Sequence, residues 1–186
     1  MLVKKDNYKK KIAPFSFDYL KSVVIPINVS VSFAVMDILS IAETDLVYNL
    51  KYRFIMRWYD YRLKYHNLKI ETAANSFTSE EVNQLWIPYV IFANTENSEY
   101  TKGESESVVT VTREGDFKES SVDVTEEINI FEGQKNIITF QQTYSKTFKC
   151  VYQLQLYPFD TQVDQTHLFD IKNIFNGRLA IQGTLD

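Results

Sequence analysis

The stretch VIPINVSVSFAV at residues 24–35 decides the fold, because apolar residues occupy every second position in it. Small or polar residues fill most of the alternate positions. Period two over this length predicts a β-strand with one buried face. Pro26 predicts a strand start or an edge strand, since proline cannot donate a hydrogen bond to a ladder. The apolar set comprises Ile25, Ile27, Val29, Val31, Phe33 and Val35.

Two further runs extend this pattern. After the short acidic connection SIAETDL at residues 40–46, a second run alternates from Tyr48 to Trp58, which predicts a long antiparallel hairpin. A third run covers residues 136–159, and Gly133 supplies the turn before it. TSEEVNQLW at residues 78–86 has an N-cap and an acidic first turn, enough for one short turn of helix. LWIPY at residues 85–89 is interpreted as a strand made rigid by proline. Together these elements predict an antiparallel β-sandwich or barrel.

Composition narrows the class of protein. A chain of 186 residues with 45% apolar and 15% aromatic residues favours one compact β domain. The net charge of −4 does not support a broad basic surface for nucleic acid. No apolar run approaches the roughly 20 residues that span a bilayer. The basic start, MLVKKDNYKKK, has no apolar region behind it, so no signal peptide is predicted.

Catalytic chemistry is not predicted, and neither is a cofactor or a metal. His66 and His167 are the only histidines, and neither has a second ligand at metal spacing. Cys150 lies on the apolar face of the third run, which favours a buried inert thiol over a nucleophile. The same lone cysteine permits no internal disulfide. Asn28 begins an Asn-Val-Ser triplet, which is a possible glycosylation acceptor.

Several motifs together resemble the extracellular domain of pentameric ligand-gated ion channels, the Cys-loop receptors. Tyr157, Pro158, Phe159 and Asp160 follow Cys150 as in that family's signature loop, but Asp164 stands where its second cysteine belongs. WYDYRL at residues 58–63 is similar to a Trp-x-Asp-x-Arg-Leu pattern, and LWIPYVIFAN at residues 85–94 looks like the start of the first ligand-binding loop. IAETDLVY at residues 41–48 looks like the loop joining the family's first two strands.

The resemblance implies roles for particular residues. It implies an immunoglobulin-like antiparallel β-sandwich with a structural set comprising Trp58, Asp60, Trp86 and Pro88. Asp60 is also expected to hydrogen-bond locally and cap the strand end. The implied interface ligand set comprises Tyr52, Arg53, Phe92, Asn94, Phe169 and Ile171. The implied gating set comprises Glu43, Asp45, Tyr157, Pro158, Phe159 and Asp160. Cys150 is then an unpaired Cys-loop cysteine.

The resemblance also implies an organisation and partners. The chain is expected to be one extracellular domain, with an irregular N-terminal segment at residues 1–20 and a sandwich at residues 21–186. It is expected to stop before the family's last two strands and four membrane helices. The implied partners are a small neurotransmitter and related subunits in a homo- or hetero-pentamer at the extracellular face of the plasma membrane.

Two alternatives stay open at this point. One is a soluble pentameric transmitter-binding protein of the same fold, against which the apolar Tyr157 and Phe159 argue. The other is an unrelated carbohydrate-binding or adhesion β-sandwich.

The loop that carries the resemblance gives its own prediction. Because the family closes a disulfide there, Cys150 and Asp164 should have Cα atoms within the roughly 4.4–6.8 Å of bridged cysteines. We expect Asp164→Cys to form a disulfide under oxidising conditions and to raise the melting temperature. Failure of the two thiols to pair would remove the main support for a gating role of the loop.

Overall fold

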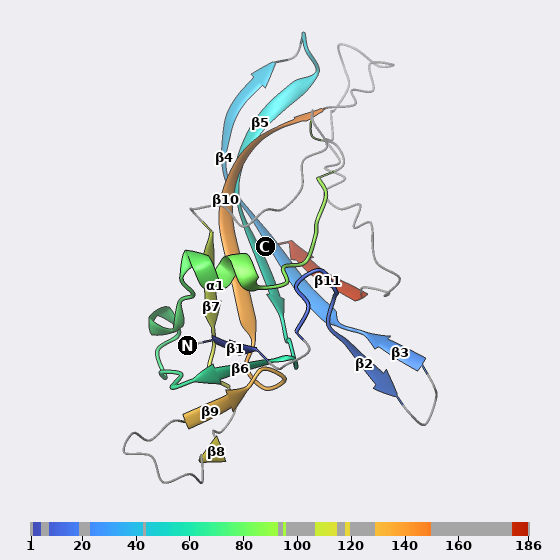
Figure 1. The fold of residues 1–186 in the computed structure, drawn as a ribbon. Coiled ribbons are helices and arrows are strands. Elements are labelled where there is room, and N and C mark those ends of the chain that lie inside the picture. Colours follow the sequence, from blue (N-terminus) through green and yellow to red (C-terminus); the bar gives the residue numbers. More distant parts are fainter. Residues whose placement is uncertain are drawn as a thin grey trace.

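The protein is almost entirely β-structure (Figure 1). The computed structural model describes residues 2–4, 8–18, 23–42, 44–92, 95, 107–114, 118–119, 129–149 and 180–185. Its strands are β1 (Leu2–Lys4), β2 (Phe15–Asp18), β3 (Val23–Pro26), β4 (Asn28–Ala42), β5 (Val47–Trp58), β6 (Leu63–His66), β7 (Val108–Val111), β8 (Lys118–Glu119), β9 (Asn129–Glu132), β10 (Ile138–Lys149) and β11 (Ala180–Leu185). The helical elements are a 3₁₀ turn, η1 (Thr72–Asn75), and a helix, α1 (Ser79–Gln84).

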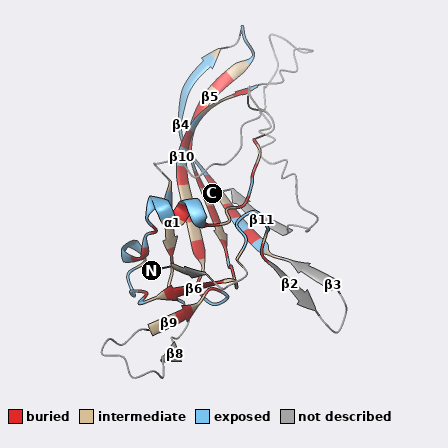
Figure 2. Ribbon diagram, in the orientation of Figure 1, coloured by how far each residue is buried: buried red, intermediate tan, exposed pale blue. Residues whose placement is uncertain are grey.

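Two main sheets share one hydrophobic core. The larger has the order β11-β4-β5-β10-β7 and the smaller has the order β1-β6-β9-β8, while β2 and β3 form a separate hairpin. All pairings are antiparallel except β11 with β4. Buried side chains from both main sheets belong to one cluster. Figure 2 marks buried residues along β5 and β10. The predicted all-β sandwich is confirmed.

The hairpin of β4 and β5 forms as predicted, but its buried face is shorter than the sequence indicates. Val29, Val31 and Phe33 are buried, whereas Val35, expected on the same buried face, is 56% exposed. Register shifts follow Val35 and Ile38, so the strict alternation of β4 is lost from there on. Beyond that point β4 and β5 extend as an arm whose β4 side is exposed (Figure 2).

Strand β10 carries most of the third predicted run. It pairs with β5 over its whole length, from Ile138 opposite Trp58 to Lys149 opposite Val47. Its even-numbered residues face the core, as period two requires, and Ile138, Phe140 and Phe148 have no exposed surface. The rest of the run, from Cys150 onwards, lies outside the described residues.

Gly133 occupies the predicted turn before β10, but a different property of glycine is needed there. Its backbone is not in the left-handed region. Instead a Cβ atom at this position would overlap the carbonyl oxygen of Asp60 and lie 2.8 Å from that of Leu63. The Gly133 amide donates a 3.0 Å hydrogen bond to the same Leu63 oxygen. Close approach of two backbones therefore selects glycine at this turn.

Two expectations for other segments were wrong. The N-terminal segment is not wholly irregular, because β1 pairs with β6 in the smaller sheet and β2 pairs with β3 in the separate hairpin. Residues 86–90 form no strand after α1. Pro88 is buried there and lacks a backbone donor, which disfavours pairing in a ladder.

Helix α1 begins with the predicted cap. The Thr78 hydroxyl accepts a hydrogen bond from the Glu81 amide, and the Glu81 carboxylate accepts one from the Thr78 amide at 2.9 Å. The same carboxylate also accepts a 3.1 Å hydrogen bond from the Leu2 amide. Glu81 thus caps the helix and also fastens β1 to it. Partial burial alone would raise the pKa of Glu81, but the hydrogen bonds from Thr78 and Leu2 outweigh it and the pKa is lowered.

Replacing Glu81 by alanine should lower the free energy of unfolding by about 1–2 kcal/mol, because one cap and one inter-element hydrogen bond are lost. A carboxyl with a lowered folded-state pKa stabilises the fold above its unfolded pKa, and that stabilisation disappears as pH falls through the folded value. Denaturant titrations should therefore show a difference between wild type and Glu81→Ala at pH 7 that shrinks below pH 4. Exposed Glu80 is the control, and an equal loss in Glu80→Ala would contradict the specific role of Glu81.

Candidate functional site

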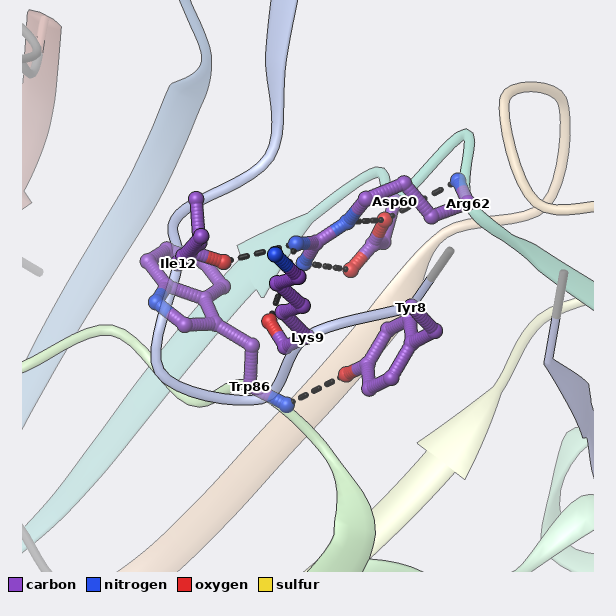
Figure 3. A network of polar contacts seen from close by, with 6 residues as sticks. All are labelled: Tyr8, Lys9, Ile12, Asp60, Arg62 and Trp86. Carbon is purple, nitrogen blue, oxygen red and sulfur yellow. Dashed lines mark hydrogen bonds and ion pairs between the residues drawn. The ribbon is translucent and has the colours of Figure 1, made fainter. Parts of the chain in front are cut away.

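A buried ion pair joins the end of β5 to the start of β6. Asp60 has no exposed surface and accepts hydrogen bonds from the Arg62 backbone amide (3.0 Å), Nε (2.8 Å) and Nη2 (2.6 Å). The predicted local capping by Asp60 is confirmed by the first of these bonds. Two side-chain bonds to one carboxylate use the planar fork of the guanidinium, so the arrangement is specific to arginine. Figure 3 shows both side chains in this arrangement.

Arg62 also holds the N-terminal segment. Its Nη1 donates to the backbone oxygens of Ile12 (2.6 Å) and Lys9 (3.3 Å), and its guanidinium carbon lies 4.7 Å from the centre of the Tyr8 ring. The Tyr8 hydroxyl accepts a 2.6 Å hydrogen bond from the Trp86 amide (Figure 3). Arg62 therefore links the Asp60 turn to residues 8–12, and Tyr8 extends this link to the chain after α1. We call Tyr8, Asp60, Arg62 and Trp86 the Asp60 hub.

Of the four residues predicted to be structural, Asp60 and Trp86 belong to this hub, and Trp58 and Pro88 lie close to Trp86. Trp58 is fully buried and packs edge-on against Trp86, with ring centres 6.1 Å apart. Pro88 is buried two residues further on. The pKa of Tyr65, whose hydroxyl is buried, is raised first by burial and then by the charge of Asp60. These contacts favour a structural role, in which the residues hold the chain after α1 against the sandwich. That chain is the one expected to begin the first ligand-binding loop.

The predicted ligand residues Tyr52 and Phe92 lie together but are not on the surface. Both have no exposed surface, and their ring centres are 5.7 Å apart in an edge-on contact. Phe33, Phe54 and Tyr144 complete an aromatic cluster around them. Burial raises the pKa of Tyr52, with a smaller contribution from Tyr144. Neither ring is accessible from solvent in this arrangement, so their assignment to an interface site gains no support, and both rings lie in the core.

Arg53 has the opposite environment. It lies on the outer face of β5 and is exposed, with Ala34 and Thr143 beside it on the neighbouring strands. No ion pair joins Arg53 to any residue that the structure describes. Its short neighbours leave the guanidinium accessible from solvent.

The remaining predicted residues divide into two groups. Asp45 is exposed in the turn at the end of the β4–β5 arm, and Asn28 is exposed at the start of β4. The others lie outside the described residues: Glu43, Asn94, Cys150, Tyr157, Pro158, Phe159, Asp160, Asp164, Phe169 and Ile171.

Sequence reasoning missed two features of this region. Tyr8 gives no local signal, because its partners Arg62 and Trp86 are far away in sequence. Lys146 does give one, since it occupies a core-facing position between Tyr144 and Phe148, where the pattern predicts an apolar residue. A charged residue that breaks a period-two pattern could have been noted from the sequence alone.

An all-β sandwich does not by itself specify a function, and comparison with known proteins supplies the class. Residues 2–168 match the family model described as neurotransmitter-gated ion-channel ligand binding domain. The chain therefore belongs to this family of extracellular ligand-binding domains of membrane channels, which is not a family of enzymes. A search of curated proteins returned no match.

Two further observations concern the described residues alone. None of their helices is long and apolar enough to cross a membrane. Within the same ranges, no group of three or more histidine, cysteine, aspartate or glutamate side chains is placed to hold a metal ion.

Proposed function

We propose that the chain is the extracellular domain of a channel subunit that binds a small transmitter between neighbouring subunits and couples binding to pore opening. The family match over residues 2–168 carries this proposal. The subunits would form a homo- or hetero-pentameric ring, in which a head-to-tail interface closes on itself. The domain would stand at the extracellular face of the plasma membrane, with the membrane-spanning part supplied by segments outside these 186 residues.

The transmitter we propose carries a carboxylate. Arg53 supports this choice, because an exposed guanidinium can donate two parallel hydrogen bonds to a carboxylate. A quaternary amine would instead need accessible aromatic faces. Tyr52 and Phe92, the aromatic residues first expected to supply them, have no exposed surface.

Arg53→Ala should raise the half-maximal concentration of an amino-acid transmitter by about 10- to 100-fold, because a charge-assisted hydrogen bond is lost. The measurement is current evoked by glycine, γ-aminobutyrate and glutamate in cells that express the full-length subunit. Arg53→Lys should give an intermediate shift, since lysine keeps the charge without the fork.

Arg57→Ala is the matched control. Arg57 lies on the same outer face of β5, four residues or about 13 Å further along the strand. A general electrostatic effect would raise the half-maximal concentration equally in both variants. A specific contact would raise it in Arg53→Ala alone. A strong and selective response to acetylcholine would contradict the carboxylate proposal.

For coupling, we propose the end of the β4–β5 arm. The exposed carboxylate of Asp45 supports this, because it stands in the turn furthest along the arm from the Asp60 hub (Figure 1). The same recordings on Asp45→Asn should show a reduced maximal current. Labelling of the subunit at the cell surface should show unchanged expression. A shift in transmitter binding without loss of maximal current would contradict a coupling role.

A further inference from the structure

Lys146 stands at a place in β10 where the fold calls for an apolar side chain. Its neighbours two residues away, Tyr144 and Phe148, are 5% and 0% exposed, and it pairs across the ladder with buried Leu50. Lys146 itself is half-buried. Burial of the amine lowers its pKa, since the charged form loses water. Another interaction must offset the free-energy cost of removing a charged ammonium group from water at this position.

Two aromatic rings face this ammonium group. Its Nζ lies 4.9 Å from the centre of the Tyr144 ring and 5.7 Å from that of Phe92. Both distances are within the range in which a ring face attracts a cation. The two rings meet at 64° with their centres 5.6 Å apart, so they form two sides of one corner.

Hydrogen bonds hold both sides of this corner in place. The Tyr144 hydroxyl donates to Gln142 Oε1 at 3.0 Å, and Ser107 donates to the same oxygen at 2.7 Å. On the other side, the hydroxyl of buried Thr95 donates to the Phe92 carbonyl at 2.8 Å, and Thr95 bridges to Phe148. None of these contacts involves the lysine, and they hold the Tyr144 ring and the backbone at Phe92.

We propose that Tyr144 and Phe92 form a cation-binding site on the core side of β10, which Lys146 occupies in this structure and which takes a small ammonium ion when the lysine is removed. The site is separate from Arg53, which lies on the opposite face of the sheet and suits an anion. It rests on the local geometry and does not depend on the proposed transmitter.

The first test fills the vacated site. Tetramethylammonium chloride is titrated onto purified Lys146→Ala at constant ionic strength, with the melting temperature as readout. We expect a saturable rise of about 2–4 °C, because a ligand that binds the folded state stabilises it. Wild type should show no saturable rise, since its own ammonium occupies the site. Lys149→Ala, which removes an exposed lysine from the other face of β10, should behave as wild type.

Two further titrations test whether this binding requires a charged ligand and the Tyr144 ring. The neutral analogue tert-butanol should give no saturable rise in Lys146→Ala, and adding Tyr144→Leu should abolish the response to tetramethylammonium. Equal stabilisation by both compounds, or stabilisation by neither, would overturn the proposal.

A second measurement needs no truncation of the lysine. Lysine amines of the wild type are labelled by reductive ¹³C-methylation, and Lys146→Met identifies the resonance of Lys146. We expect this resonance to lie upfield of the other lysines, because it is shielded by two ring faces, and to return to their position in Tyr144→Leu. A Lys146 resonance among those of the exposed lysines would overturn the proposal even if Lys146→Ala does not fold.

Discussion

Replacing Asp60 by alanine should destabilise the domain by about 3–5 kcal/mol, because it leaves the guanidinium of Arg62 without its counter-ion in a mostly buried place. The Arg62 side chain is 11% exposed and that of Asp60 is 1% exposed. The variant also loses the acceptor of three hydrogen bonds from Arg62. Denaturant unfolding measures the loss, and the melting temperature should fall by about 10 °C.

The effect should reach beyond the turn itself, because Arg62 also holds residues 8–12. Amide exchange at Trp86 reports on this link, since its N–H is bonded to the Tyr8 hydroxyl. We expect faster exchange at Trp86 in Asp60→Ala under native conditions. Unchanged exchange at Trp86 would mean that the contacts of Arg62 with the N-terminal segment do not depend on Asp60.

Two controls separate charge from packing. Asp60→Asn keeps an oxygen for the Arg62 amide but removes the charge, so its loss should be intermediate. Exposed Glu71, which has no described ion pair, should tolerate alanine with a change within about 0.5 kcal/mol. In the double variant Asp60→Ala/Arg62→Ala the loss should be smaller than the sum of the two single losses, because no unpaired charge remains. Additive losses would argue against a coupled pair.

Gly133→Ala should cost about 3 kcal/mol or more, an unusually large effect for one methyl group. The added Cβ would overlap the carbonyl oxygen of Asp60, which is backbone and cannot swing away. Relief of the overlap requires separation of the β9–β10 turn from the Asp60–Leu63 turn. That movement would also lengthen the 3.0 Å hydrogen bond from Gly133 to Leu63.

The neighbouring residue provides the control for Gly133. Gln134 lies in the same turn and is exposed, so Gln134→Ala should leave the unfolding free energy nearly unchanged. Since the backbone of Gly133 is not left-handed, Asn or Asp should be no better tolerated than alanine. Tolerance of Asn but not of Ala would show that backbone conformation, rather than close approach, is the requirement.

Local pattern in the sequence was sufficient for the strands of the larger sheet. The alternation of Val29, Val31 and Phe33 and the matching run from Tyr48 to Trp58 specify one buried face each, because side chains in a strand point to opposite sides at every step. The cap of α1 was equally predictable, since Thr78 and Glu81 act within one helical turn. The order of the motifs along the chain was enough to indicate the family.

What the sequence could not determine depends on contacts between distant segments. Arg62 meets Tyr8 and the Ile12 carbonyl only because β1 joins the edge of β6, and no local pattern encodes that pairing. Tyr52 and Phe92 were expected at an interface, but packing of the chain after α1 against β5 enclosed both rings. A sequence specifies which way a side chain points from its own strand, whereas the tertiary structure decides what covers it. For this protein, the direction of side chains along each strand was enough to predict the sandwich. The tertiary structure decided that Arg53 is accessible, whereas the aromatic residues beside it lie in the core.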